Sequence, residues 1–243
     1  MATIDENSLA QLLAKDVKLH FIEPQIYSVC PDAGEARLYD RMAKFYDRVV
    51  CNRFYNRIVW GYSVKQYEAV VHEALESAKN GWVLDAGCGS LAFSAKSYSG
   101  FSERPIIFLD KSLTLLRIAK ARMRQLNQQV PANMVFLQGD ALQLPFNPQS
   151  IRTVVSMNLL HVIPEIKKVV LGIKNILEDS GTIVFTTLVR SNRFLANKYL
   201  NFMGSMGEAV PRDIGQLLAV FQELGMPVKH QVAGNLAFIN YGY

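Results

Sequence analysis

The sequence predicts an α/β protein with a mostly parallel sheet of seven strands, whose last strand is antiparallel, and with helices on both faces of the sheet. Short apolar runs alternate with helix-like segments from residue 82 to residue 189, which is the pattern of parallel strands joined by crossover helices. Only Ala233-Gly234-Asn235 separates the last two apolar runs, and so short a connection requires an antiparallel hairpin. A chain of 243 residues is long enough for this domain and an N-terminal helical appendage.

The first 62 residues are expected to form the helical appendage. Thr3 and Glu6 have the spacing of a capping box, and apolar residues recur at helical spacing between Ala33 and Val50. Aromatic residues mixed with arginines follow at 52–62. We interpret these aromatics as packing the appendage onto the core. The alternative is that some of them line an acceptor pocket or contact a membrane interface.

The core is expected to span residues 63–243, because Ser63 and Gln66 form a second capping box at the start of a long helix. Its strands are predicted at 82–85, 106–109, 134–137, 153–157, 182–189, 228–232 and 236–239. Its helices are predicted at 63–80, from about residue 91, and at 113–126, 164–178 and 213–224. Residues 190–211 have no regular pattern and carry aromatic and basic side chains, which predicts a mobile lid over an acceptor.

Composition limits the compartment and the partners. Twenty-six Lys and Arg residues against 21 Asp and Glu residues give a net charge of +5, which permits an anionic acceptor or membrane surface without requiring one. The three cysteines are irregularly spaced, which argues against a disulfide framework or a metal site and favours a reducing compartment. An acidic N-terminus and the absence of a bilayer-spanning apolar run indicate a cytoplasmic protein. The basic residues at 117–124 are expected to face solvent.

A strand followed by a tight glycine turn at residues 83–90 is the most informative stretch. Gly87 and Gly89 allow positive φ angles and leave no Cβ between the backbone and a ligand. Asp110 follows the next strand about 20 residues later, which is the spacing at which an acid reaches a ribose diol. The alternative for Asp110 is a helix cap. Because carboxyl ends of parallel strands meet at one edge, these residues are expected in one cleft.

The same turn also satisfies the G-x-G-x-x-A form of the dinucleotide fingerprint, so an NAD-dependent oxidoreductase is an alternative. Asp85 would then place a negative charge beside the pyrophosphate, whereas a ligand with an ammonium group would be attracted to it. Asp140 ends the third strand and is suited to accept a hydrogen bond from an exocyclic amine. These acids favour a zwitterionic nucleoside over a dinucleotide.

In order and spacing, residues 83–90, 108–112 and 139–146 resemble the class I S-adenosylmethionine-dependent methyltransferases, most closely the small-molecule and quinone or lipid methyltransferases. The resemblance runs roughly from Ser63 to Tyr243. It implies a Rossmann-like doubly wound sheet, S-adenosylmethionine as the cofactor, and a small-molecule or lipid-like acceptor. Residues 38–47 also resemble the Tyr-Asp-rich helix that precedes the core in that group.

The resemblance implies a role for each matching residue. The methionine end is held by Asp85, Gly87 and Gly89, and the sulfonium region is closed by Met157 and Asn158. The ribose and the adenine are bound by Asp110, Lys111, Asp140, Ala141 and Leu142. From the N-terminal helix, the cofactor is covered by Tyr39 and Tyr46.

The sequence departs from the family pattern at two places. Leu91 stands where the family usually has a third glycine, which leaves a non-catalytic S-adenosylmethionine-binding module as an alternative function. Ile151-Arg152 replaces the usual Phe-Asp, but at the far end of its strand, where little effect on chemistry is expected.

His161 and Tyr46 are the candidate catalytic residues. Methyl transfer from a sulfonium can proceed by alignment alone, so we expect His161 to have a positional role. No Asn-Pro-Pro-aromatic motif follows the fourth strand, which argues against methylation of base amines in nucleic acid.

Overall fold

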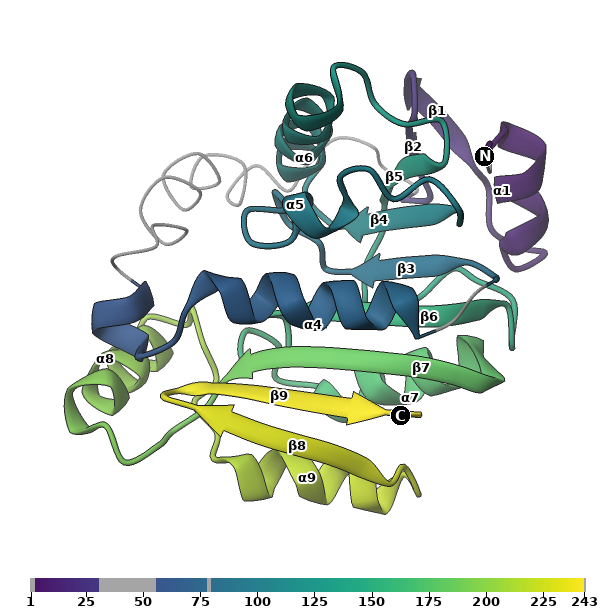
Figure 1. Ribbon diagram of the computed structural model, residues 1–243. Coiled ribbons are helices and arrows are strands. Elements are labelled where there is room, and N and C mark those ends of the chain that lie inside the picture. The colour runs from purple at the N-terminus through teal and green to yellow at the C-terminus, as the bar shows by residue number, and fades with distance from the viewer. Residues whose placement is uncertain (1–2, 31–55, 78–79, 243) are drawn as a thin grey trace.

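The computed structural model describes residues 3–30, 56–77 and 80–242 (Figure 1). Its centre is a nine-stranded sheet in the order β1-β2-β5-β4-β3-β6-β7-β9-β8. The strands are β1 (His20–Glu23), β2 (Ile26–Ser28), β3 (Val83–Ala86), β4 (Ile106–Asp110), β5 (Met134–Gln138), β6 (Ile151–Met157), β7 (Leu177–Leu188), β8 (Val228–Ala233) and β9 (Leu236–Tyr241). Adjacent strands from β2 to β7 pair in parallel, and β9 pairs antiparallel with both β7 and β8. The predicted class, a mostly parallel sheet closed by an antiparallel hairpin, is confirmed.

The predicted number of seven strands was wrong, because the segment expected to be helical contributes two more. β1 and β2 form a short hairpin, and β2 pairs in parallel with β5 through Ile26 and Phe136. Both strands are too short to show a clear alternation of polar and apolar residues. β5 holds both strands in place, because the backbone groups on its outer side need hydrogen-bond partners and β2 supplies them.

Helices cover the sheet in two layers (Figure 1). They are α1 (Glu6–Leu12), the π-helical turn η1 (Asn56–Trp60), α4 (Val64–Glu76), α5 (Ala95–Tyr98), α6 (Leu113–Asn127), α7 (Ile166–Ile176), α8 (Phe194–Ser205) and α9 (Ile214–Glu223). α4, α5 and α6 pack on one face of the sheet, and α1, α7 and α9 pack on the other. Each layer of helices packs on the sheet through its own apolar cluster, and the sheet lies between the two layers.

One of the two capping boxes expected from the sequence is present in the structure. The capping box of Ser63 and Gln66 opens α4 as predicted, with the Gln66 side chain accepting from the Ser63 amide at 2.9 Å. The box expected at Thr3 and Glu6 was wrong, because Asp5 and Ser8 form it instead. The helix expected between residues 33 and 50 lies outside the described residues.

Residues 190–211 contain a helix rather than the irregular segment that the sequence predicts. α8 spans Phe194–Ser205 and buries Ala196 and Leu200 against the core. Among the described residues, no helix is long and apolar enough to cross a lipid bilayer.

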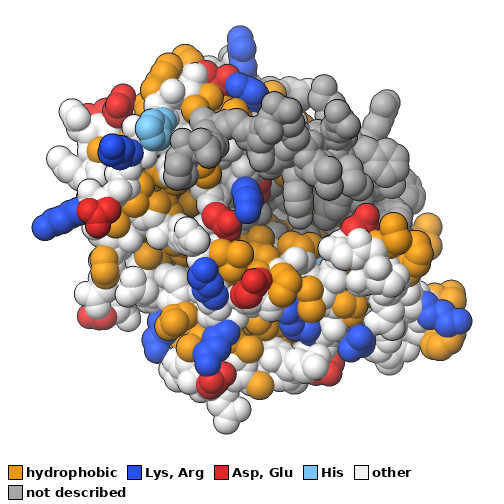
Figure 2. All heavy atoms as spheres, turned by 180° about the vertical axis from the view of Figure 1, so that it is seen from behind, with side chains coloured by type: hydrophobic (Ala, Val, Ile, Leu, Met, Phe, Trp, Pro, Cys, Tyr) orange, Lys and Arg blue, Asp and Glu red, His pale blue; other side chains and the backbone are white. Residues whose placement is uncertain are grey.

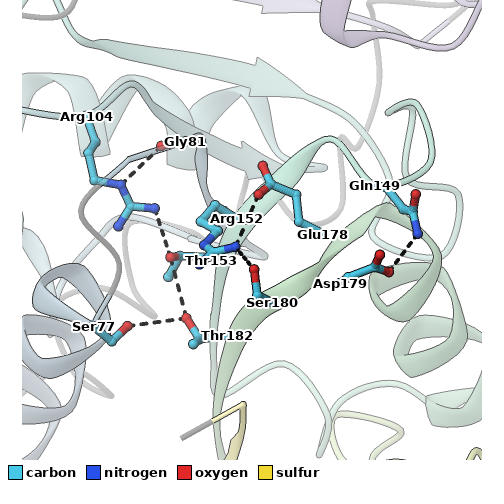
Figure 3. Close-up of polar contacts among 10 residues, drawn as sticks. All are labelled: Ser77, Gly81, Arg104, Gln149, Arg152, Thr153, Glu178, Asp179, Ser180 and Thr182. Atoms are coloured by element: carbon cyan, nitrogen blue, oxygen red, sulfur yellow. Dashed lines mark hydrogen bonds and ion pairs between the residues drawn. The ribbon is translucent and has the colours of Figure 1, made fainter.

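The amino-terminal ends of the strands are held by a buried cation, Arg104 (Figure 3). Its guanidinium donates to the Thr153 hydroxyl at 2.9 Å and to the carbonyl oxygens of Gly81 and Leu75 at 3.1 and 3.2 Å. Arg152 lies at the same end and pairs with Glu178 at 3.4 Å, in agreement with the expectation that this departure is remote from the ligand edge. These contacts stabilise the fold at the edge opposite the candidate site.

Replacing Arg104 with methionine should strongly destabilise the protein. At least three charge-assisted hydrogen bonds disappear, and the carbonyl groups of Leu75 and Gly81 lose a donor, which should lower the free energy of unfolding by about 2–5 kcal/mol. For a chain of this size the melting temperature should fall by roughly 5–15 °C. Arg152→Met is the matched control, since its partly exposed ion pair contributes about 1 kcal/mol or less. Equal losses in both variants, measured by thermal denaturation, would contradict the role given to Arg104.

Candidate functional site

The predicted site residues follow four neighbouring strands at one edge of the sheet. β5, β4, β3 and β6 are adjacent in the sheet, and their carboxyl ends lie on the side of Figure 1 where η1 and α8 are drawn. In that order the strands lead into Asp140, Asp110, the Gly87–Gly89 turn and Asn158. Strands lie about 4.8 Å apart, so this edge presents a row of groups roughly 14 Å long.

The glycine turn is tied to the neighbouring strand. The amide groups of Gly87 and Cys88 both donate to the Leu109 carbonyl, at 2.8 and 3.0 Å. Gly87 has φ +74°, and a Cβ there would lie 2.8 Å from the Leu159 side chain. At Gly89, with φ +55°, the space that a Cβ would occupy is open. The turn therefore needs glycine at the first position for packing and offers bare backbone to a ligand at the second.

Leu91 occupies the position where the family usually has a third glycine. Its φ is +57°, so leucine adopts the left-handed conformation that glycine favours. Its side chain is fully buried in the layer beneath α4, α5 and α6. Burial of this apolar side chain offsets the cost of the left-handed backbone conformation.

Asp110 joins the turns that follow β3 and β4. One carboxylate oxygen accepts from the Gly89 amide at 2.8 Å and the other from the Ser112 amide at 2.9 Å. The cap of α6 is Ser112, whose hydroxyl accepts from Leu115. Burial raises the pKa of Asp110, and these backbone donors lower it. Asp110 is thus not the helix cap, and each of its oxygens keeps acceptor capacity for a hydroxyl group.

Asp85 is a buried acid with one unpaired oxygen. Tyr98 donates to its Oδ2 at 2.9 Å, while Oδ1 is buried without a partner among the described residues. Burial raises the pKa of Asp85 from 3.8 to about 7; the Tyr98 hydrogen bond opposes the rise and the charge of Asp110 adds to it. A buried, half-satisfied carboxylate is suited to a cationic partner.

An exposed ion pair connects the carboxyl ends of β4 and β5. Lys111 contacts Asp140 at 3.0 Å, and the other Asp140 oxygen accepts from the Leu142 amide at 2.9 Å. Ala141 is buried beside them, and the carbonyl of Lys111 accepts from Gln138. The structure therefore brings together the four residues expected around an adenine.

At the carboxyl end of β6, Asn158 contacts an aromatic cluster. Asn158 has φ +58°, and its side-chain oxygen accepts from the Tyr67 hydroxyl at 3.0 Å. Tyr67 comes from α4, is fully buried, and stacks on Phe93 with 5.0 Å between ring centroids. Met157 packs against the same cluster. The corner expected to hold the sulfonium is therefore apolar and rigid.

His161 is buried directly below this edge. Its Nδ1 accepts from the Leu188 amide at 3.4 Å and lies 3.4 Å from the Thr187 hydroxyl. Burial lowers the pKa of His161 to about 4, and the charge of Arg212 adds to the effect. The other proposed catalytic residue, Tyr46, lies outside the described residues, as does Tyr39.

Three residues of the site escaped the sequence analysis. Tyr67 and Tyr98 lie in segments that were read as ordinary helix, and only the fold shows that their hydroxyls reach Asn158 and Asp85. Arg122 was expected to face solvent, but its guanidinium contacts both the carbonyl and the hydroxyl of Ser90 in the glycine loop. In the same run of basic residues, Arg117 and Lys120 pair with Glu23 of β1.

The geometry of the loop is unsuited to a pyrophosphate. A dinucleotide site aims the first turn of a helix at the phosphates, directly after the glycines. Here the next helix, α5, begins only at Ala95 and is four residues long. Asp85 also lies buried behind the turn. The unpaired oxygen of Asp85 and the open space at Gly89 are the features of this turn that remain without a partner group among the described residues.

This site, at the carboxyl edge of a mostly parallel sheet, is that of an α/β enzyme with a nucleoside cofactor. Residues 77–216, more than half of the chain, match the protein family described as "Methyltransferase domain", and the chain belongs to that family. It is a class I S-adenosylmethionine-dependent methyltransferase, and S-adenosylmethionine is its cofactor.

Individual relatives are distant. An uncharacterized chloroplastic methyltransferase of Arabidopsis thaliana is 29% identical over 122 residues, which are 50% of this chain and 35% of that protein. The match thus spans about a third of that relative's length.

Solved structures agree in fold at low identity. One is a Haloferax volcanii methyltransferase in complex with the Trm112 activator (TM-score 0.62, 14% identity, 86% of this chain and 98% of that one). Another is a Haemonchus contortus phosphoethanolamine N-methyltransferase with S-adenosylhomocysteine (0.60, 18%, 81% and 44%). A third is a geranyl diphosphate methyltransferase with its acceptor and sinefungin (0.56, 11%, 73% and 77%).

Asp85→Asn should remove a pH dependence of stability. Because folding raises the pKa of Asp85 from 3.8 to about 7, the folded protein retains a proton that the unfolded chain releases. The free energy of unfolding should therefore fall as the pH rises between these values, by up to about 4 kcal/mol. Asparagine cannot ionise, so the variant should gain stability relative to wild type as the pH rises from 5 to 8, in denaturant titrations of the free protein.

Asp179→Asn is the matched control, because it makes the same substitution at an exposed carboxyl group on the opposite edge (Figure 3). Parallel pH profiles of wild type and Asp85→Asn would mean that folding does not raise the pKa of Asp85, which contradicts the role given to its burial.

Proposed function

We propose that this methyltransferase transfers its methyl group to a small acceptor with an apolar, lipid- or quinone-like body. The observation that carries the proposal is the apolar cluster at the corner of Met157 and Asn158. Its buried members are Trp60, Tyr62, Tyr67, Leu188, Ala196, Leu200, Ala209, Leu236 and Phe238. Acceptor pockets are mostly apolar with few polar groups, so an apolar cluster next to the proposed sulfonium region supports an acceptor that gains by leaving water.

The names of two structural neighbours point in the same direction. One acts on geranyl diphosphate, and the other was solved with phosphomonomethylethanolamine. Both acceptors are small molecules. The likeness to these neighbours is one of fold, so it supports a small acceptor without identifying it.

The cofactor roles proposed for individual residues follow the sheet order. Asp140, Ala141, Leu142 and Lys111 bind the adenine, and Asp110 binds the ribose hydroxyls. Asp85 with the turn at Gly87 and Gly89 holds the methionine end, while Met157 and Asn158 close the sulfonium region. Tyr39 and Tyr46 cover the cofactor from the N-terminal segment.

Catalysis is proposed to rest on alignment. The bound cofactor supplies a methyl group already activated on a sulfonium, and orientation of the acceptor can remove much of the remaining barrier. His161 is a weak base, because burial lowers its pKa to about 4 and its Nδ1 already accepts from the backbone. It is proposed as a positioning residue that holds the end of β7 beside the site.

The acceptor class is tested with S-adenosylmethionine carrying a labelled methyl group. The full chain is incubated with separate lipid-soluble and aqueous extracts of its source cells. The label should appear in the lipid-soluble fraction and depend on the enzyme. Label recovered in protein, nucleic acid or a water-soluble product alone would overturn the proposed acceptor class, whereas release of S-adenosylhomocysteine in either extract would still report methyl transfer.

Asp110→Ala should reduce labelling at limiting cofactor by weakening cofactor binding. Charge-assisted hydrogen bonds contribute about 1.5–3 kcal/mol each, so calorimetry should give at least about a tenfold weaker dissociation constant for S-adenosylhomocysteine. NAD should not bind to the wild type. Asp179→Ala makes the same substitution at the opposite edge and should bind as the wild type does. Unchanged affinity in Asp110→Ala would contradict the site assignment.

A further inference from the structure

The outer face of α8 is unusually apolar. Of the ten large hydrophobic side chains that are exposed among the described residues, five lie on α8 and its C-cap: Phe194, Leu195, Tyr199, Phe202 and Met206. Leu195 is 79% exposed and Phe202 is 58% exposed. Positions 195, 199, 202 and 206 follow the helical repeat and therefore form one continuous stripe.

The opposite side of the same helix is also apolar, because Ala196 and Leu200 pack into the cluster that contacts Met157. Tyr199 of the stripe also packs against Trp60, with 5.5 Å between the ring centroids. A surface helix normally has a polar outer face, so a large exposed apolar stripe marks an interaction surface. The stripe together with Phe194 and Ile58 is called the α8 face. Ile58 is 73% exposed on η1, and its carbonyl accepts from Arg193 at 3.0 Å.

Basic residues surround the α8 face. Arg57, Arg190, Arg193 and Lys198 are all exposed, and no Asp or Glu occurs from residue 189 to residue 207. Lys198 lies over the Phe194 ring at 4.7 Å from its centroid. Figure 2 shows hydrophobic and Lys or Arg side chains side by side at its right-hand edge, where the rotated view brings α8.

The combination of apolar and basic side chains on the α8 face favours one kind of binding partner over others. A second copy of the chain would bring four cations against four cations, which is unfavourable. Aromatic and aliphatic side chains interleaved with Lys and Arg are instead the composition of helices that lie in the interface of a bilayer. Each cation near an anionic leaflet adds to the attraction, and the long stems of Lys and Arg allow their charges to remain in the headgroup layer.

We propose that the α8 face docks the enzyme onto an anionic lipid surface, with the carboxyl edge of the sheet turned toward the membrane. This rests on the proposed function in one respect, since it supplies the route by which an apolar acceptor reaches the site. α8 and η1 lie on the same side of the molecule as the carboxyl ends of β3 and β4 (Figure 1). Docking therefore places the membrane next to the cofactor.

The test is flotation of the full chain with vesicles of phosphatidylcholine alone or with added phosphatidylglycerol. Wild type should float with the anionic vesicles at low salt. Binding to neutral vesicles, or to anionic vesicles at high salt, should be at least about tenfold weaker. The double variant Leu195→Glu/Phe202→Glu should lose at least about tenfold in binding to anionic vesicles. Leu171→Glu is the matched control, because Leu171 is 50% exposed on α7 and lies outside the α8 face.

S-adenosylhomocysteine binding, measured by calorimetry, shows that each variant is folded and should be the same in all. No flotation of the wild type, or equal flotation of both variants, overturns the proposal. It is likewise overturned if size-exclusion shows a wild-type dimer that Leu195→Glu/Phe202→Glu dissociates, because a second copy then covers the face. Methyl labelling of a lipid-soluble product without flotation would leave the proposed function standing, and flotation without such labelling would refute the function alone.

Discussion

Asp85 brings a carboxyl group into the apolar layer between the sheet and α5, where Tyr98 donates to one oxygen and the other has no partner among the described residues. An ionised carboxylate is costly there, so burial raises its pKa to about 7. A bound ammonium changes the balance, because it pairs with the charge at the moment it arrives. The proposed role of Asp85 follows from this balance, because a cationic ligand group is favoured beside it and a pyrophosphate is disfavoured.

The order of the strands places the other candidate site residues beside Asp85. β5, β4, β3 and β6 are neighbours, so an acid or amide that follows each of them joins one row. Asp110 holds the row together by accepting from Gly89 and Ser112 on two different turns. The aromatic cluster under α8 then bounds the end of the row at Met157. The proposed cofactor site, the aromatic cluster and the α8 face therefore lie on the same side of the protein.

The sequence predicted the parallel core because its strands are buried on both faces and appear as continuous apolar runs, as at residues 106–109 and 134–137. It predicted that Asp85, Asp110 and Asp140 would lie at the carboxyl ends of neighbouring strands, because each ends or directly follows an apolar run. It missed the β1–β2 hairpin, whose strands are held by the edge of β5. It also missed Tyr98 and Arg122, since contacts across 13 and 32 residues arise only from tertiary packing. The left-handed backbone at Leu91 could not be foreseen, since a leucine rarely adopts it and the burial of this side chain is known only from the fold.

The most direct test of this account is the number of protons released when S-adenosylhomocysteine binds, measured by calorimetry in buffers of different ionisation enthalpy. With a pKa of about 7, Asp85 is mostly protonated in the free enzyme at pH 6.5, and pairing with the ammonium ionises it. Wild type should release roughly 0.7 proton per cofactor at that pH, and Asp85→Asn should release close to none. A binding enthalpy that is independent of the buffer in the wild type, or equal release in both proteins, would contradict the role given to the buried carboxyl group.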